Sequence, residues 1–149
     1  MMRAMTAADL PAVLAIEQAV QPYPWTAGNF RDALQAGYVA RVLENDGVVQ
    51  AFMVWFPLPD EAELLNIAVA ASAQRRGLGR QVLQELLDTA RQQGRQRVFL
   101  EVRVSNVPAI ELYLHAGFAV NGERRNYYKN ANGSENALVM VWEEEANRG

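Results

Sequence analysis

Apolar residues recur along the chain at two spacings, and these predict where helices and strands lie. In four stretches the apolar positions are three and four residues apart, as on one face of a helix. In the stretches between them, apolar residues alternate with polar ones or form a short continuous run, which is typical of strands. We expect helices over 7–19, 27–34, 78–93 and 107–116, and strands over 38–43, 48–56, 63–69, 98–102, 118 onwards, 123–129 and 137–142.

Turn residues set the borders of these elements. Pro22 and Pro24 cannot continue the first helix. Asn45-Asp46-Gly47 and Asn132-Gly133 each lie between two predicted strands and are strong hairpin signals, because Asn, Asp and Gly tolerate the positive φ of tight turns. The tail from Glu143 to Gly149 is expected to fray.

The middle of the chain predicts the architecture. A near-continuous apolar strand ending at Val69 is followed by an amphipathic helix that Gly94 closes, and then by the strand over 98–102. A strand, a helix and a strand in this order form a parallel crossover, so the two strands should be neighbours in one sheet. Together with the antiparallel hairpins before and after it, this crossover predicts a mixed α/β sheet flanked by helices.

Length and composition limit the class of protein. The 149 residues are half apolar, enough for one domain, 1–149, with its own core. The absence of cysteine excludes a disulfide framework and a thiolate zinc site. The apolar stretch from Leu10 to Val20 contains Glu17 and fits neither a secretion signal nor a membrane span, so we expect a soluble, cytoplasmic protein. The net charge of −3 argues against nucleic-acid binding and favours a basic partner, and the oligomeric state is left open.

A polar loop, Gln74-Arg75-Arg76-Gly77-Leu78-Gly79-Arg80, joins the apolar strand to the amphipathic helix. Its two glycines, a single residue apart, let the backbone adopt positive φ and gather several N–H groups into one concavity. The helix that follows adds its own unpaired N–H groups and the positive end of its dipole. The three arginines place positive charge at the rim. We therefore predict that this loop binds a diphosphate.

Other interpretations of these glycines have different residue requirements. A Walker loop needs Gly-Lys-Ser or Gly-Lys-Thr, and the only lysine is Lys129, which excludes that mode of ATP binding. The dinucleotide-binding fingerprint needs a third glycine where Val82 stands. It also needs the glycines directly after the strand, whereas Ala70 to Arg76 intervene. The remaining alternative is an ordinary strand-to-helix turn with its arginines in water.

Three segments together resemble the GNAT family of acetyl-CoA-dependent N-acetyltransferases. They are the Arg/Gln-x-x-Gly-x-Gly loop from Gln74 to Gly79, the strand Leu100-Glu101-Val102, and the segment from Asn106 through Tyr113 to Gly117-Phe118. The resemblance spans essentially the whole chain. It implies the GNAT fold, with a mixed and partly splayed sheet. It also implies direct acetyl transfer from acetyl-CoA to an amine, without a metal or a covalent enzyme intermediate.

Five segments resemble more narrowly the GNAT members that acetylate the N-terminal alanine of small-subunit ribosomal protein eighteen. They are Ile16-Glu17-Gln18, Pro24-Trp25-Thr26, Asn66-Ile67-Ala68-Val69, Leu100-Glu101-Val102-Arg103 and Arg124-Arg125-Asn126-Tyr127-Tyr128. Five local matches in the same order are more specific than the loop alone. This resemblance implies a basic ribosomal protein N-terminus as partner, without direct nucleic-acid binding. The alternatives are a GNAT enzyme for a small-molecule amine and a coenzyme-binding regulatory module without turnover.

Acetyl transfer to an amine needs a base, and Glu101 is the candidate. An α-amino group has a pKa of about 8, so a modest base suffices at neutral pH. Val98, Leu100 and Val102 share one face of the predicted strand, which directs the Glu101 carboxylate to the other face. The resemblance implies the same role, because Glu101 matches the family's proton acceptor. On the residues alone, it could equally be a solvated carboxylate or a partner of Arg103.

The departing thiolate needs an acid, and Tyr113 is the candidate. A phenol is protonated at neutral pH and donates when a thiolate forms beside it. The apolar pattern alone favours a core tyrosine beside Ile110 and Leu114, whereas the resemblance implies the proton donor.

Asn106 matches a coenzyme-contacting position of the family, and an N-cap role is an equally physical interpretation.

The resemblance also implies how the rest of the coenzyme is held. The backbone of one strand, splayed from its neighbour, pairs with the pantetheine arm as an added strand would, and the loop binds the diphosphate. The residues assigned to these two parts are Ile67, Ala68, Val69, Arg75, Arg76, Gly77, Leu78, Gly79 and Arg80. Trp25, Tyr127 and Tyr128 are expected to line the entry of the amine.

Overall fold

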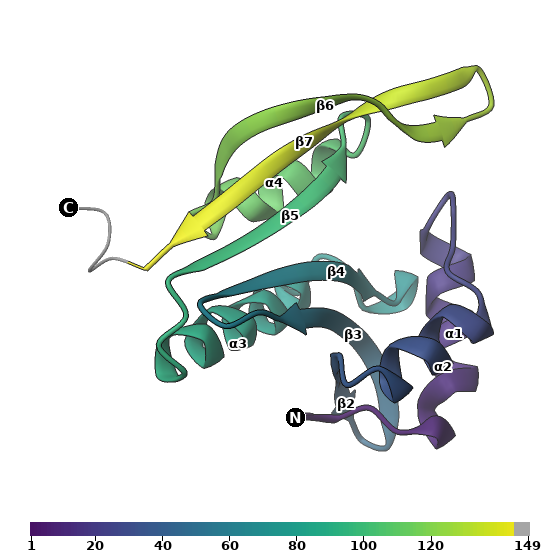
Figure 1. Ribbon diagram of the computed structural model, residues 1–149. Coiled ribbons are helices and arrows are strands. Elements are labelled where there is room, and N and C mark those ends of the chain that lie inside the picture. Colours follow the sequence, from purple (N-terminus) through teal and green to yellow (C-terminus); the bar gives the residue numbers. More distant parts are fainter. Residues whose placement is uncertain (145–149) are drawn as a thin grey trace. The chain divides into compact units, whose positions relative to one another are not determined.

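The computed structural model describes residues 1–144, and residues 145–149 of the predicted tail lie outside the described part. Figure 1 shows the elements in their places along the chain. The helices are η1 (Ala7–Asp9), α1 (Leu10–Val20), α2 (Ala27–Gln35), η2 (Ala71–Ala73), α3 (Leu78–Gln92) and α4 (Val107–His115). The strands are β1 (Met2–Ala4), β2 (Val39–Asn45), β3 (Val48–Pro57), β4 (Glu61–Val69), β5 (Arg97–Arg103), β6 (Ala119–Asn130) and β7 (Gly133–Glu143).

The described strands form one mixed sheet with the order β1-β2-β3-β4-β5-β7-β6. The parallel pairing of β4 with β5 confirms the predicted crossover. The neighbouring pairs β1-β2, β2-β3, β5-β7 and β6-β7 are antiparallel. The two predicted strands after residue 118 are a single long strand, β6. The short β1 and η2 have no counterpart in the predictions, because three residues are too few to show a period.

The chain packs as two compact units. The first contains Met1–Pro57 and Leu65–Leu86, and the second contains Leu58–Leu64 and the chain from Leu87 onwards. Strand β4 and helix α3 each contribute to both units. The prediction of one domain over 1–149 stays a prediction. No described helix combines the length and the apolar character that a membrane span requires.

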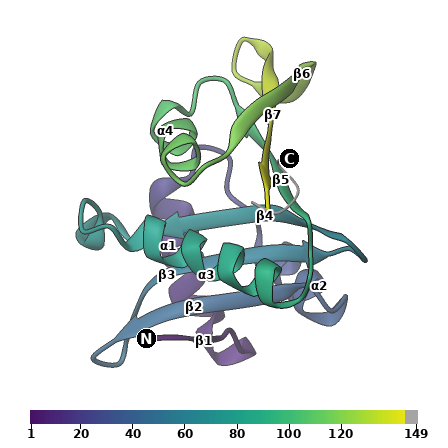
Figure 2. The same cartoon turned by 90° about the vertical axis from the view of Figure 1, so that its left-hand side faces the viewer.

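In the first unit, β2 and β3 form a hairpin. Its turn has positive φ at Asp46 (53°) and Gly47 (77°), as the sequence predicts. Helices α1 and α2 cover one face of these strands, and α3 runs across the other face (Figure 2). The side under α1 and α2 is filled by a cluster of buried residues that includes Val13, Phe30 and Phe52. This packing fixes the loop between α1 and α2 relative to β4.

In the second unit, β5 lies between the first half of β4 and β7. Val98 and Leu100 of β5 and Met140 and Trp142 of β7 are buried. Strands β6 and β7 form a long hairpin whose register shifts twice, the second time between Arg124 and Tyr128. The second shift matters for function, because it determines which side chains of β6 lie next to β5.

Candidate active site

Glu101 lies on β5 opposite Val139 of β7. Val98, Leu100 and Val102 are buried on one face of β5, and Glu101 is on the other, which agrees with the predicted alternation. Only 11% of the Glu101 side chain is exposed. Glu101 is therefore largely covered rather than a solvated strand carboxylate.

The two oxygens of the Glu101 carboxylate have different surroundings. Nε of Arg124 lies 3.3 Å from Oε1. Oε2 is buried and has no hydrogen-bond partner among residues 1–144. A buried acceptor without a donor is costly unless a ligand or water completes it. Oε2 is therefore the oxygen of this carboxylate that is available to receive a proton.

Two tyrosines of β6 lie beside this carboxylate. A hydrogen bond to Glu101 is the main cause that raises the pKa of Tyr127. The Tyr128 hydroxyl donates to the backbone oxygen of Glu101 at 3.1 Å. Burial, followed by the charge of Glu101, raises the pKa of Tyr128 to about 12. Both phenols are consequently neutral donors at physiological pH.

Arg103, which the sequence suggested as a partner for Glu101, forms a 2.9 Å ion pair with Glu135. Its guanidinium also donates to the backbone oxygen of Lys129 at 3.0 Å and lies 4.3 Å from the centre of the Tyr128 ring. Arg103 therefore holds the β6–β7 hairpin and Tyr128 in place. Arg124, the cation at 3.3 Å from Glu101, was not predicted as its partner.

Glu63 is a second carboxylate near Glu101. In the β4–β5 register it lies opposite Phe99. Burial raises the pKa of Glu63, and the negative charge of Glu101 raises it further, whereas Arg124 lowers it. A neighbouring negative charge in a covered site disfavours ionisation of Glu63. The arrangement therefore makes protonation of Glu63 easier than protonation of an exposed glutamate.

Tyr113 is buried in α4 of the second unit. Its ring packs at 5.7 Å from that of Phe118. Burial is the main cause that raises the pKa of Tyr113, and the nearby Tyr128 adds to it. Tyr113 thus keeps its proton at neutral pH and is a phenol that can donate it. Asn106 caps α4, because its Oδ1 accepts from the N–H of Ala109 at 3.3 Å.

The predicted diphosphate loop lies in the first unit, directly before α3. Positive φ occurs at Arg75 (66°) and Gly77 (76°). Gly79 is already inside α3 and is not among the residues with positive φ, so of the two glycines Gly77 provides the left-handed backbone. The N–H of Gln81 donates to the oxygen of Gly77 at 3.0 Å, which places the unpaired N–H groups of the first turn next to the loop.

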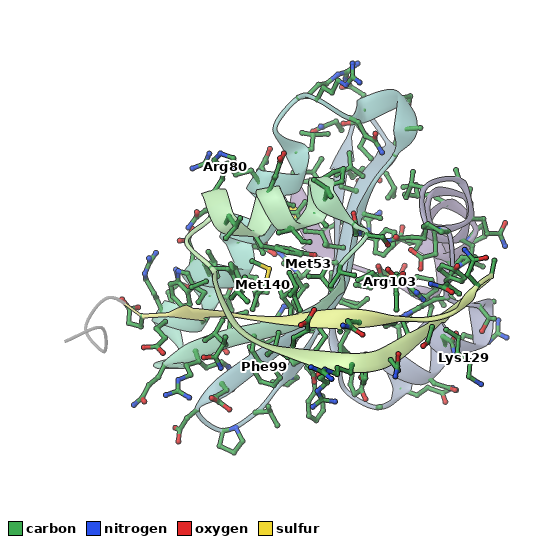
Figure 3. All side chains as sticks on the ribbon, turned by 90° about the horizontal axis from the view of Figure 1, so that it is seen from above. Met53, Arg80, Phe99, Arg103, Lys129 and Met140 are labelled. Atoms are coloured by element: carbon green, nitrogen blue, oxygen red, sulfur yellow. The ribbon has the colours of Figure 1, made fainter. Side chains whose placement is uncertain are left out.

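The three arginines of this loop are exposed, and none forms an ion pair with a residue of the described chain. Figure 3 shows Arg80 pointing away from the ribbon. Cations that have no carboxylate partner remain available to an anionic ligand.

Ile67, Ala68 and Val69 form the end of β4. The parallel register with β5 ends at Leu64 and Leu100, although β4 continues to Val69 and β5 to Arg103. The splay that the resemblance implied stays a prediction.

A buried carboxyl group connects α1 to β4 in the first unit. Glu17 is 1% exposed, and its Oε2 accepts from the N–H of Trp25 at 2.9 Å and from Nδ2 of Asn66 at 3.0 Å. Gln21 in turn donates to Oδ1 of Asn66 at 3.3 Å and to the oxygen of Ile67 at 3.4 Å. This network fixes Trp25, which the sequence predicted at the entry of the amine.

Glu17→Ala should lower the free energy of unfolding by about 3 kcal/mol, because it leaves the Trp25 N–H and the Asn66 amide buried without their acceptor. Glu17→Gln retains an acceptor oxygen and should cost about 1 kcal/mol. Urea denaturation measures both. Glu111→Ala, on the exposed side of α4, is the control and should change stability by less than about 0.5 kcal/mol. Equal losses in the two Glu17 variants would contradict this account.

The wild type and Glu17→Gln should also differ in pH dependence. Burial raises the pKa of Glu17 above its ordinary value of 4.5. The folded protein then binds the proton more tightly than the unfolded chain. Glu17 therefore contributes stability that is complete below 4.5 and is lost as the pH rises through the folded pKa. Between about pH 4 and about pH 8, the wild type should lose stability relative to Glu17→Gln. A constant difference would contradict the burial of an ionisable carboxyl.

Comparison with known sequences decides the family. A profile described as the acetyltransferase (GNAT) family matches residues 10–118. The chain belongs to the GNAT family. It is 41% identical over 133 residues to the ribosomal protein bS18-alanine N-acetyltransferase of Escherichia coli K12, RimI, covering 89% of this chain and 90% of the relative. The Salmonella typhimurium enzyme of the same name is 41% identical over 137 residues, covering 92% and 93%.

Solved GNAT structures have the same fold. The crystal structure of the Escherichia coli ribosomal-protein-S18-alanine N-acetyltransferase gives a TM-score of 0.89 at 38% identity, covering 96% of this chain and 92% of that one. Ard1 from Thermoplasma volcanium gives 0.83 at 28% identity, covering 95% of each chain. A GNAT acetyltransferase from Elizabethkingia anophelis with acetyl-CoA bound shares the fold at a TM-score of 0.79 and 18% identity, covering 97% of each chain.

These comparisons confirm the predicted family, the GNAT fold and N-acetyltransferase activity, and GNAT enzymes use acetyl-CoA. Within the second unit, the structure brings Glu101 together with Arg124, Tyr127 and Tyr128. Within the first, it places the left-handed loop directly before α3. Arg124 lies in one of the segments that carry the resemblance, but its pairing with Glu101 was not predicted, because that pairing depends on the register of β6.

Proposed function

We propose that this GNAT enzyme transfers the acetyl group of acetyl-CoA to the α-amino group of the N-terminal alanine of ribosomal protein bS18, in the cytoplasm. The observation that carries the proposal is 41% identity to enzymes named for this reaction across nearly the full length of both chains. The basic N-terminal segment of a ribosomal protein also suits a chain with a net charge of −3.

The loop before α3 is proposed to bind the diphosphate of acetyl-CoA. The left-handed backbone at Arg75 and Gly77 and the start of α3 offer N–H groups, and the unpaired Arg75, Arg76 and Arg80 offer charge. Leu78 and Gly79 contribute their N–H groups at the first turn. Acetyl-CoA supplies the activated acetyl thioester. The N–H and C=O groups of Ile67, Ala68 and Val69 are proposed to pair with its pantetheine arm, and Asn106 to contact the coenzyme in addition to capping α4.

Glu101 is proposed as the base. The substrate α-ammonium must lose a proton before it can attack, and Oε2 of Glu101 has no donor among the described residues. It receives this proton directly or through a water molecule. Arg124 lies beside the other oxygen, Oε1, and leaves Oε2 free to accept the proton.

Tyr113 is proposed as the acid. Its buried phenol holds a proton at neutral pH and gives it to the sulfur as the thiolate departs. Tyr128 could not serve as readily, because its hydroxyl already donates to the backbone oxygen of Glu101. One carboxylate and one phenol thus divide the two proton transfers.

Substrate competition tests the proposal. The purified protein and acetyl-CoA are incubated with a peptide that begins with alanine, with the same peptide carrying a blocked N-terminus, with polyamines and with aminoglycosides. The proposal predicts acetylation of the free alanine peptide alone. Preferred acetylation of a polyamine or an aminoglycoside would support the small-molecule alternative, and coenzyme binding without any transfer would support the regulatory one.

Gly77→Ala should weaken the binding of coenzyme A about tenfold. A side chain at a φ of 76° is strained by about 1–2 kcal/mol, although the space around the added Cβ is open. Isothermal titration calorimetry measures the change in Kd. Gly122→Ala is the matched control, because its Cβ also meets nothing within 4 Å and no left-handed φ is required there. Unchanged affinity in Gly77→Ala would argue against this loop as the diphosphate site.

A further inference from the structure

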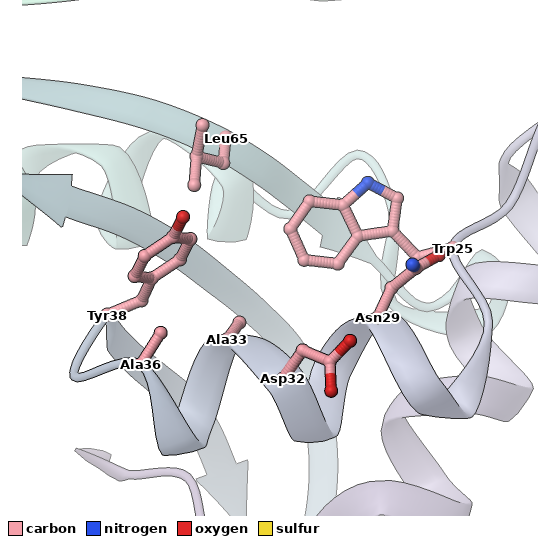
Figure 4. A pocket seen from close by; sticks show the side chains of 7 residues that line it. All are labelled: Trp25, Asn29, Asp32, Ala33, Ala36, Tyr38 and Leu65. Carbon is pink, nitrogen blue, oxygen red and sulfur yellow. The ribbon is translucent and has the colours of Figure 1, made fainter.

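A groove of about 440 Å³ opens in the first unit beside α2 (Figure 4). Its lining includes Trp25 just before α2, Asn29 and Asp32 from the helix, Tyr38 from the segment after it, and Leu65 from β4. Asn29 and Asp32 lie on the same side of α2 as the buried Ala33, because residues three and four apart share a helix face. The groove is therefore a product of the fold rather than of one loop.

The two aromatic walls of the groove are held in place. The Trp25 ring packs 5.1 Å from that of Phe30, and the Tyr38 ring packs 4.9 Å from that of Phe56. The Trp25 backbone is fixed by the buried carboxyl of Glu17 at 2.9 Å. Both rings are thus positioned before any ligand arrives, which lowers the ordering cost of binding.

Asp32 supplies the charge of the groove. Asp32 is one of the lining residues, and Figure 4 shows its carboxylate beside α2, on the side of Asn29 and Trp25. Asp32 forms no side-chain hydrogen bond or ion pair with another residue of the described chain, whereas Glu85 in the same unit is paired with Arg41 at 2.8 Å. The groove therefore has an unpaired carboxylate in a lining that also contains two aromatic side chains, Trp25 and Tyr38.

We infer that this groove binds a cationic side chain, lysine or arginine, of the protein whose N-terminus is acetylated. The inference rests on the proposed function, because it takes the substrate to be a protein. A carboxylate attracts the cation, and aromatic faces add a cation–π attraction and cover the apolar stem. A metal ion would need more oxygen ligands than one carboxylate provides. An anionic side chain would be repelled by Asp32.

The role assigned to Asp32 is the selection of sequence downstream of the reacting amine. Asp32 does not take part in the proton transfers given to Glu101 and Tyr113. Its loss should therefore change the preference among peptides. The rate of acetylation of a peptide that contains no cationic side chain should stay the same.

A peptide series tests the inference. Each peptide begins with alanine and continues with neutral residues, and a single arginine is moved through successive positions; one peptide has no arginine. For the wild type, kcat/KM should be highest when the arginine occupies one particular position. Asp32→Asn should lower kcat/KM about fivefold for that peptide, mainly through KM, and leave the arginine-free peptide unchanged. Asp32→Lys should reverse the preference toward a peptide with glutamate at that position.

Asp46→Asn is the matched control. It removes the same charge from an exposed residue of the β2–β3 turn in the same unit and should not change the preference. An arginine preference that persists in Asp32→Asn, or that falls equally in Asp46→Asn, would overturn the inference while leaving the proposed function intact.

A binding measurement separates failure of this inference from failure of the proposed function. The arginine peptide with an acetylated N-terminus cannot react, but it should shift the indole N–H resonance of Trp25 in the NMR spectrum of the wild type and shift it less in Asp32→Asn. The absence of a Trp25 shift in the wild type would overturn the inference. A shift together with no acetylation of any alanine peptide would support the groove and refute the proposed reaction.

Discussion

Glu101→Gln should lower kcat/KM for an alanine peptide by at least about 100-fold at neutral pH, with little change in the Kd of acetyl-CoA. Glutamine has nearly the same shape as glutamate, but its amide cannot accept the proton of the ammonium. General-base catalysis contributes about 10²–10⁴ to the rates of enzymes. Oε2 of Glu101 is buried without a partner in the described chain, and we expect it to be the oxygen that accepts the proton in the wild type.

The defect of Glu101→Gln should shrink as the pH rises through about 8, the ordinary pKa of an α-amino group. Above that value most of the substrate amine is already neutral, so the base contributes less to the rate. Steady-state rates measured across the pH range for wild type and variant give the ratio directly. Glu111→Gln, on the exposed side of α4, should behave as the wild type. A defect that is small, or that does not depend on pH, would remove Glu101 from the role of base.

Tyr113→Phe is expected to have the second-largest effect, lowering kcat by about 100-fold. The phenylalanine fills the same buried space beside Phe118, so the fold and the affinity for coenzyme should change little. What the variant lacks is the proton for the departing thiolate. With a thioester of a more acidic thiol, the fall in kcat should be smaller, because that thiolate leaves without protonation.

Tyr128→Phe is the matched control for Tyr113→Phe. Tyr128 is also a phenol whose pKa is raised by burial, but its hydroxyl is engaged with the backbone oxygen of Glu101. Its removal should lower kcat by less than about tenfold. If Tyr128→Phe were the more damaging variant, the acid would have to be reassigned from Tyr113 to Tyr128.

The crossover of β4, α3 and β5 could be predicted because its signals are local and strong. The apolar residues of α3 keep helical spacing along the helix, Gly94 closes it at a φ of 73°, and a strand follows directly. The handedness and pairing of such a unit follow from chain geometry alone. The face of β5 that carries Glu101 followed in the same way from alternation.

The surroundings of Glu101 could not be predicted, because they depend on the register of a distant strand. Arg124 reaches Glu101 from β6, in the region where pairing with β7 shifts between Arg124 and Tyr128. No local pattern predicts such an irregularity. The positive φ of Arg75 could not be predicted either, because arginine rarely adopts it and glycines stand nearby at 77 and 79.

The burial of the Glu17 carboxyl has a signal in the sequence. Glu17 continues the helical spacing of Leu10 and Val13, which places an acid on the buried face of α1. A charged residue at such a position needs polar partners. Asn66, the polar residue in the otherwise apolar end of β4, is one of them.

The proposed acetylation of the N-terminal alanine of bS18 is tested most directly by mass spectrometry of small-subunit ribosomal proteins incubated with the enzyme and acetyl-CoA. We expect a mass gain of one acetyl group on bS18, located by fragmentation at its N-terminal alanine, and no gain with Glu101→Gln over the same time. Acetylation confined to lysine side chains, or to other proteins while bS18 stays unmodified, would contradict the proposed reaction.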